Sequence, residues 1–242
     1  MKVTDSCRNQ WGRSVTDFTD RPHYPFEVLR QLMDRVIADA PGALSPRVAT
    51  SGRVADDVDL VYALRDGLPG AQAQFFDRYG EYVERLLIRV LGSDPEVEDL
   101  LHEVFLQSFA CVHKLRDPGA LKPWLTRLTV NVARSCIRKR SRSRWLVFLP
   151  HERVPEVAED GSEARALMTR VYRALSGIRS AEDRIAFALR YLDGMTLPEV
   201  ARASGCSLAT AKRRVTRGKT AFLKTARRDP ELVERFDLGG AA

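Results

Sequence analysis

Cysteine is scarce and scattered in this sequence of 242 residues, which contains only four of them. Cys7, Cys111, Cys136 and Cys206 lie far apart and form no C-x-x-C pair, so neither a disulfide framework nor a cysteine-based metal site is indicated. Cys111, Cys136 and Cys206 fall within helical patterns, where we expect them to be small buried apolar residues.

Long hydrophobic runs are absent as well. No stretch approaches the roughly 18 apolar residues that a membrane span needs. The first 20 residues also lack the apolar centre of a signal peptide. The apolar content of 44% is nevertheless typical of a globular protein. We therefore expect a cytoplasmic protein without membrane insertion.

Common catalytic motifs are incomplete. His102-Glu103 and His151-Glu152 are not followed by the second histidine of an H-E-x-x-H zinc site. Gly218-Lys219-Thr220 is similar to the end of a phosphate-binding loop, but Arg213 stands where its first glycine is required. The sequence therefore predicts no enzyme: no catalytic residue, no metal, no cofactor and no small-molecule substrate.

Alternating strand patterns and fixed-period repeats are also missing, whereas apolar residues recur at helical spacing. This predicts an all-α fold of two small helical domains joined by a flexible linker, because periodicity disappears in a segment rich in proline and acids. The expected divisions are a partly disordered extension (1–55) with a helix near 26–37, a first domain (56–144), the linker (145–163), a second domain (164–229) and a tail (230–242). The expected helices are 59–68, 71–91, one from a cap at Ser93 or Asp94 to 114, 121–140, 164–175, 181–193, 197–204 and 208–227.

Charge is unevenly distributed around a formal net value of +7. Residues 116–144 contain nine basic residues and one acid, and residues 207–228 contain eight basic residues and no acid. The rest of the chain is net negative. Two basic segments on an acidic body indicate a polyanion that is bound at two places.

The second basic segment belongs to a predicted helix-turn-helix domain of winged-helix-like type. Thr196-Leu197-Pro198-Glu199 is a capping box with proline in the first turn, Gly205 suits the turn, and Ser207 begins the next helix. One stripe of that helix is apolar and comprises Leu208, Ala211, Val215 and Phe222. The opposite stripe comprises Thr210, Arg213, Arg217 and Lys224, with Arg214 and Thr216 at its edges. The pattern predicts docking in a DNA major groove, the alternative being a solvated basic helix without a ligand.

The first basic segment is a second candidate DNA surface. Its expected core stripe comprises Leu121, Leu125, Leu128, Val132 and Cys136. Arg127, Asn131, Arg134 and Arg138 recur on the opposite face, which we expect to point outward. Trp124 lies between the faces, where packing is the commoner role of such a residue. A basic helix beside an aromatic suits unpaired DNA, and the loop 115–122 is the best place to hold a flipped base.

Between the basic segments and the N-terminus lies an acidic stretch. Residues 94–103 contain five acids and no lysine or arginine. The apolar residues Val97, Leu100, Leu101, Val104 and Phe105 are partly core. The acids predict either a surface that docks a basic protein partner or an ordinary solvated helix face.

Three segments in this order, 94–106 (DPEVEDLLHEVFL), 122–134 (KPWLTRLTVNVAR) and 190–215 (RYLDGMTLPEVA, continuing to KRRV), carry a family resemblance. They resemble the polymerase-binding helix, the promoter-melting helix and the C-terminal reading domain of extracytoplasmic-function sigma factors of bacterial RNA polymerase. The resemblance covers about 56–228. It departs from the family at Leu175-Ser176, where Leu-Pro is usual, at Ser108-Phe109, where an aromatic pair ending in Trp is common, and over residues 1–55.

The resemblance implies roles for individual residues. Contact with the polymerase core is implied for Asp99, Leu100, Glu103 and Phe105. Contact with the upstream edge of the opened minus-ten element is implied for Lys122, Trp124, Arg127, Asn131, Arg134 and Arg138. Reading of the minus-thirty-five element is implied for Thr210, Lys212, Arg213, Arg214 and Arg217. The acidic linker is similar to the segment that passes toward the RNA exit path.

The function that follows is a sigma factor that binds polymerase core, recognises a promoter and opens it. Its expected partners are core polymerase and promoter DNA, with an anti-sigma factor as a further candidate. The alternative is a stand-alone helix-turn-helix regulator, which would explain residues 196–224 but not the acidic helix joined to a second basic one.

Overall fold

The computed structural model describes residues 56–92, 96–146 and 163–236. Within these ranges every regular element is helical and none is a strand, so the all-α prediction is confirmed and no β-wing is seen. The predicted helix at 26–37, the caps Ser93 and Asp94, and most of the predicted linker lie outside the described residues.

The first domain is built from a short helix, two antiparallel helices and one long basic helix. Its elements are α2 (Asp57–Arg65), α3 (Ala71–Leu91), α4 (Val97–Cys111), the 3₁₀ turns η2 (Val112–Lys114) and η3 (Pro118–Ala120), and α5 (Leu121–Leu146). Gly92 ends α3 with a positive φ of 99°, which other residues rarely adopt. Asp117 accepts a hydrogen bond from the Gly119 N–H and so forms the turn before α5. The basic helix is six residues longer than predicted and reaches Leu146.

The second domain contains the helix-turn-helix. Its elements are α6 (Glu163–Ser176), α7 (Ala181–Phe187), the π-helical turn η4 (Ala188–Leu192), α8 (Leu197–Ser204), α9 (Leu208–Ala226) and α10 (Pro230–Arg235). Helix α10, which the sequence analysis assigned to a tail, begins where Asp229 accepts hydrogen bonds from the Glu231 and Leu232 N–H groups. Pro230 in its first turn favours the same start.

The predicted caps of the helix-turn-helix are present. Glu199 accepts hydrogen bonds from the N–H (2.8 Å) and the hydroxyl (2.7 Å) of Thr196 at the start of α8. Gly205 follows α8 in the left-handed conformation, with φ 64°. Ser207 accepts a hydrogen bond from the Thr210 N–H and starts α9. The local turn chemistry of the sequence therefore determines where α8 begins and ends and where α9 begins.

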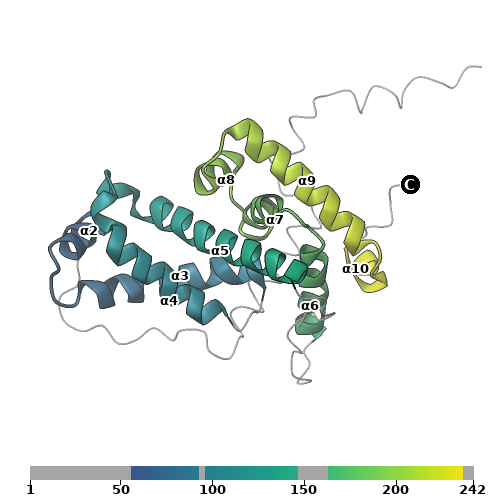
Figure 1. The fold of residues 1–242 in the computed structure, drawn as a ribbon, viewed down its shortest axis with the longest axis horizontal. Coiled ribbons are helices and arrows are strands. Elements are labelled where there is room, and N and C mark those ends of the chain that lie inside the picture. The colour runs from purple at the N-terminus through teal and green to yellow at the C-terminus, as the bar shows by residue number, and fades with distance from the viewer. Residues whose placement is uncertain (1–55, 93–95, 147–162, 237–242) are drawn as a thin grey trace, which may run out of the picture.

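The two domains are packed against each other and share one continuous hydrophobic core. In Figure 1, α5 runs along the middle of the molecule, with α3 and α4 on one side and α7 and α8 on the other. The long basic helix thus lies between its own domain and the helix-turn-helix. This arrangement decides which of its basic side chains are accessible.

Candidate nucleic-acid and protein interfaces

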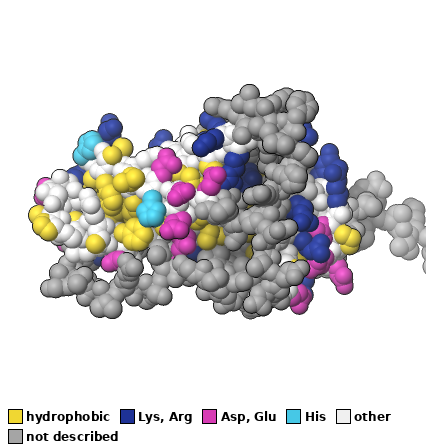
Figure 2. Space-filling view, turned by 60° about the horizontal axis from the view of Figure 1, so that its bottom comes forward, with side chains coloured by type: hydrophobic (Ala, Val, Ile, Leu, Met, Phe, Trp, Pro, Cys, Tyr) yellow, Lys and Arg dark blue, Asp and Glu magenta, His cyan; other side chains and the backbone are white. Residues whose placement is uncertain are grey.

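The outer face of α4 is acidic and carries one prominent apolar side chain. Glu98, Asp99 and Glu103 are exposed, and Leu106 is 68% exposed. On the part of the first domain seen in Figure 2, hydrophobic, acidic and histidine side chains lie next to one another. An exposed leucine among acids suits a protein partner that presents an apolar contact with basic surroundings.

Two of the residues predicted for this surface face inward. Leu100 and Phe105 are only 9% and 3% exposed. The Phe105 ring packs against Phe75 and Phe76, with centroids 5.2 and 4.8 Å apart. The helical spacing thus turns both residues into the core, as their apolar character predicted, and their contact with a partner stays a prediction. The sequence analysis missed Leu106, although its position one residue beyond Phe105 places it on the outer face.

The basic helix α5 is anchored by the apolar stripe that the sequence predicted. Leu121, Leu125, Val132 and Cys136 are buried, whereas Leu128 is half-buried. The buried hydroxyl of Thr129 donates to the Leu125 carbonyl, so it carries no unsatisfied polar group into the core. Trp124 is half-buried and packs against this core, as the packing interpretation predicted.

The opposite face of α5 divides into exposed and covered side chains. Arg127 and Asn131 are exposed, as predicted. Arg134 is half-buried, and its guanidinium donates to the Asn131 side-chain oxygen (2.7 Å) and to the Ser204 carbonyl (3.1 Å). The expectation that Arg134 points to solvent is therefore wrong here, because the second domain covers it. Burial also lowers the pKa of Arg134.

A second cation that is paired with the second domain, although still exposed, lies one turn further along α5. Arg138 forms an ion pair with Glu182 of α7. Although partial burial opposes it, this contact holds the pKa of Glu182 below its usual value. Arg134 and Arg138, two residues predicted to meet DNA, are thus engaged by the second domain.

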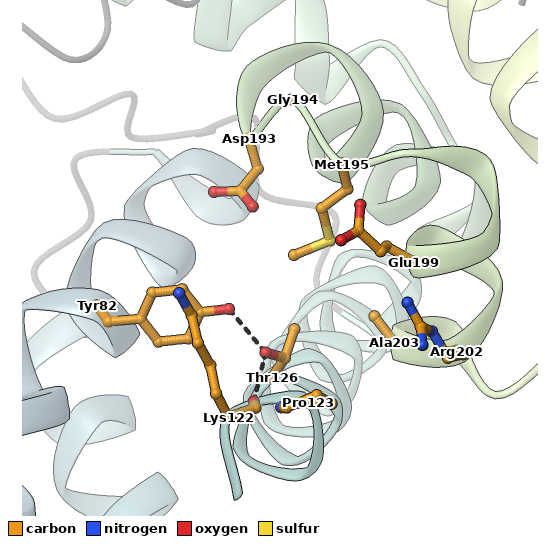
Figure 3. A pocket seen from close by; sticks show the side chains of 10 residues that line it. All are labelled: Tyr82, Lys122, Pro123, Thr126, Asp193, Gly194, Met195, Glu199, Arg202 and Ala203. Atoms are coloured by element: carbon orange, nitrogen blue, oxygen red, sulfur yellow. Dashed lines mark hydrogen bonds between the residues drawn. The ribbon is translucent and has the colours of Figure 1, made fainter. Parts of the chain in front are cut away.

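A cavity of about 390 Å³ lies between the domains at the start of α5. Figure 3 shows Tyr82, Lys122 and Thr126 of the first domain on one side and Asp193, Met195 and Glu199 of the second on the other. The hydroxyls of Tyr82 and Thr126 are 2.7 Å apart, and the Lys122 ammonium lies 4.8 Å from the centroid of the Tyr82 ring. The domains therefore do not pack tightly along their whole contact.

On α9 the predicted DNA-reading residues differ in accessibility. Arg213 is exposed, whereas Thr210, Lys212 and Arg214 are half-buried. The apolar stripe is buried at Ala211, Val215 and Phe222, but Leu208 is 45% exposed, contrary to the prediction. Leu208 is the first residue of the helix, where no neighbouring turn covers it.

Arg217 is exposed but already paired. Its guanidinium donates two hydrogen bonds, of 3.0 and 2.9 Å, to the carboxylate of Asp183 on α7. These hydrogen bonds raise the pKa of Arg217. Asp183 is buried, so the pair joins α9 to α7 at the point where the two helices cross. The sequence analysis missed Asp183 because its partner lies 34 residues away.

The described residues contain no cluster of three potential metal ligands. None of the helices in these ranges is long and apolar enough to cross a membrane. Cys136 is buried as predicted, while Cys111 and Cys206 are only partly so, and none of these three described cysteines forms a disulfide.

Comparison with known families identifies both domains. Residues 75–143 match sigma-70 region 2, and residues 180–222 match sigma-70 region 4. The chain is 31% identical over 149 residues to the ECF RNA polymerase sigma factor SigE of Mycolicibacterium smegmatis, an alignment that covers 59% of this chain and 56% of that protein. It is 29% identical over 196 residues to the probable RNA polymerase sigma factor RfaY of Xanthomonas campestris pv. campestris, an alignment that covers 76% of this chain and 47% of that protein. The chain thus spans about half the length of these two relatives.

The fold is also similar to that of a solved structure, the sigma factor RpoE in complex with the anti-sigma factor NepR from Bartonella quintana. The TM-score is 0.50 at 21% identity, and the match covers 66% of this chain and 99% of that one. At this identity the likeness concerns the fold alone.

Proposed function

Because the chain belongs to the extracytoplasmic-function sigma factors, we propose that it binds the core of bacterial RNA polymerase and directs promoter recognition and opening. The observation that carries this proposal is the division of charge among three helices, with an acidic and apolar outer face on α4 and basic faces on α5 and α9. Such a factor works in the cytoplasm and supplies binding, while the polymerase supplies the chemistry.

We assign the outer face of α4 to the polymerase core. Asp99, Glu103 and Leu106 are exposed there and combine negative charge with an apolar contact. Negative charge would repel DNA phosphates but would steer a basic protein surface toward the helix. Phe105 supports this surface from below, because its ring packs against Phe75 of α3, and Leu100 is buried as well.

The two basic helices are assigned to the two promoter elements. Helix α5 would meet the upstream edge of the opened minus-ten element through Lys122, Arg127, Asn131, Arg134 and Arg138, with Trp124 beside them. Helix α9 would enter the major groove of the minus-thirty-five element, where exposed Arg213 can bind a guanine through two hydrogen bonds. Thr210, Lys212 and Arg214 would hold the nearby backbone.

Transcription with purified core polymerase tests the proposal. The chain should bind core in a pull-down without DNA and should yield promoter-dependent transcripts from a library of bacterial genomic fragments. A chain that bound DNA but not core would instead be a stand-alone helix-turn-helix regulator. An anti-sigma factor is a further proposed partner, supported by the complex in which the Bartonella sigma factor was solved.

Paired substitutions separate the surfaces. Glu103→Ala combined with Leu106→Ala should weaken core binding and leave the affinity of the free chain for DNA unchanged. Arg213→Ala should leave core binding unchanged and reduce promoter selectivity. If both variants lost only DNA affinity, the assignment of α4 to the polymerase would be wrong.

A further inference from the structure

The cavity of about 390 Å³ is bounded by both domains in their closed arrangement, in which α5 and the helix-turn-helix are packed against each other. Its walls come from α3 and α5 on one side and from α8 and the loop before it on the other (Figure 3). The volume lies near the lower end of the roughly 300–1,000 Å³ that small-molecule sites occupy. Four of the ten lining residues are charged, which indicates a polar ligand of modest size.

The two cations of the cavity come from opposite domains and lack an ion pair. Lys122 of α5 and Arg202 of α8 are both exposed, and neither forms a salt bridge with a described residue. Lys122 lies instead over the Tyr82 ring. Hydrogen bonds from Thr196 lower the pKa of Glu199 most, and the two cations lower it further, so both act at the same place. A phosphate between them would supply the hydrogen-bonded counter-charge that neither has.

The two acids of the cavity, in contrast, already have polar partners. Asp193 is paired with Arg89, and both side chains are largely buried. Glu199 accepts hydrogen bonds from the N–H and the hydroxyl of Thr196 through one carboxylate oxygen, Oε2, at 2.8 and 2.7 Å. A carboxylate has lone pairs on both oxygens, so each acid can still accept a hydrogen bond from a neutral group. The part of a ligand that reaches these acids should therefore carry hydroxyls and no negative charge.

We propose that this cavity binds a phosphorylated metabolite with free hydroxyl groups, either a sugar phosphate or a mononucleotide. The flexible side chains of Lys122 and Arg202 would hold its phosphate from opposite domains. Asp193 and Glu199 would accept hydrogen bonds from its sugar hydroxyls. The Met195 side chain, which also lines the cavity, would supply an adaptable apolar contact.

This site is separate from the proposed function, because its occupancy can be measured on the free chain without polymerase. Lys122 also belongs to the surface that we assign to the minus-ten element, so DNA is left out of the measurement. Because the two cations belong to different domains, the ligand binds only the closed arrangement and adds its binding free energy to the contact between the domains.

Two variants remove the site by different means. Arg202→Gln removes one cation at an exposed position of α8. Ala203→Leu fills the cavity without changing the charge, because Ala203 lines it and is only 4% exposed. Arg228→Gln is the matched control, since Arg228 is an exposed cation that does not line the cavity. Circular dichroism checks that each variant is folded.

Isothermal titration calorimetry on the full chain uses four probes: ribose 5-phosphate, adenosine 5′-monophosphate, adenosine and inorganic phosphate. At least one of the two phosphorylated sugars should bind with one molecule per chain. Adenosine and inorganic phosphate, which each lack half of the expected contacts, should bind at least about tenfold more weakly. Equal affinity for the two phosphorylated sugars indicates a sugar phosphate, and tighter binding of the nucleotide indicates that its base is also contacted.

The variants decide whether such binding occurs in the cavity. Arg202→Gln should weaken it about tenfold or more, Ala203→Leu should abolish it, and Arg228→Gln should match the wild type. The inference is overturned if neither phosphorylated sugar shows saturable binding, or if inorganic phosphate binds as tightly as they do. Equal losses in Arg202→Gln and Arg228→Gln would also overturn it, because they would show only attraction to a basic protein. If Ala203→Leu is unfolded, the comparison of the two arginine variants is sufficient.

Discussion

The arginines of the two basic helices differ in whether a partner already holds them. Arg213 is exposed, whereas Arg217 is bound by Asp183 through two hydrogen bonds. Arg134 is half-buried, and its Nε is buried without a hydrogen-bond partner among the described residues. A buried N–H without a partner costs on the order of 1–3 kcal/mol, so the closed arrangement carries a local penalty that opening would relieve.

Arg213→Ala and Arg217→Ala should therefore have different consequences for DNA binding. We expect Arg213→Ala to reduce discrimination at one base pair by about 1–3 kcal/mol. Arg217→Ala should leave discrimination unchanged and lower Tm, because it leaves the buried Asp183 carboxylate unpaired. Competition binding with single-base promoter variants and thermal unfolding measure the two effects. Equal losses of discrimination in both variants would show that Arg217 leaves Asp183 to bind DNA.

The hydrogen bonds that Glu199 accepts predict that its contribution to the stability of the protein depends on pH. The hydroxyl and the N–H of Thr196 hold the pKa of Glu199 below the usual value of a glutamate. A carboxylate whose pKa is lower in the folded than in the unfolded state adds stability above the unfolded pKa and loses it as pH falls through the folded pKa. Glu199→Gln should therefore lower Tm at pH 7, and the difference from the wild type should shrink as pH falls below about 4. A difference in Tm that stays constant between pH 7 and pH 3 would show that the stabilisation does not come from the ionised carboxylate of Glu199.

At the scale of the elements, local sequence signals predicted most helices, and long-range packing decided the exceptions. The cap at Thr196, the turn glycine at Gly205 and the cap at Ser207 lie within a few residues of the structure they fix, so α8 and α9 were predicted closely. The π-helical turn η4 replaces the end of a predicted α-helix, and no local signal marks it. Burial of Phe105 was only half anticipated, because its ring neighbours Phe75 and Phe76 come from α3.

The crossing of α7 and α9 depends on a residue without a side chain. A side-chain carbon at Gly218 would lie 2.6 Å from the Asp183 carbonyl and 2.8 Å from the Phe187 Cβ, which is closer than such atoms pack. Gly218→Ala should push the helices apart and destabilise the second domain by about 1–3 kcal/mol, despite the higher helix propensity of alanine. Thr216→Ala on the exposed face of the same helix is the control for chemical denaturation. Equal or greater stability of Gly218→Ala would mean that the crossing can widen without loss.

At the scale of the whole molecule, the contact between the domains could not be predicted from the sequence. Several of its hydrogen bonds end on backbone carbonyls, such as those of Ile88, Val90 and Ser204, which accept from Tyr172, Arg184 and Arg134. A carbonyl group is present at every residue, so no pattern of side chains marks the ones that will be used. The sequence predicted two separate domains for that reason, and the positions of Arg134 and Arg138 could not be foreseen.

Because the domains are held by this contact, we expect the loss of an ion pair between them to destabilise the protein less than the loss of an ion pair within one domain. Removing one partner of a buried ion pair typically costs about 3–5 kcal/mol, because the other charge stays buried. Arg217→Ala should approach this loss, since the Asp183 carboxylate that it leaves unpaired is buried and cannot return to water without unfolding its domain. Asp193→Asn should cost less, because the domains can part and return Arg89 to water, so its loss cannot exceed the free energy that holds them together. Denaturant unfolding and small-angle X-ray scattering distinguish the two cases: we expect Asp193→Asn to enlarge the native chain and Arg217→Ala to leave its size unchanged. A native Asp193→Asn chain of wild-type size that is as unstable as Arg217→Ala would show that the two domains unfold as one unit and do not open.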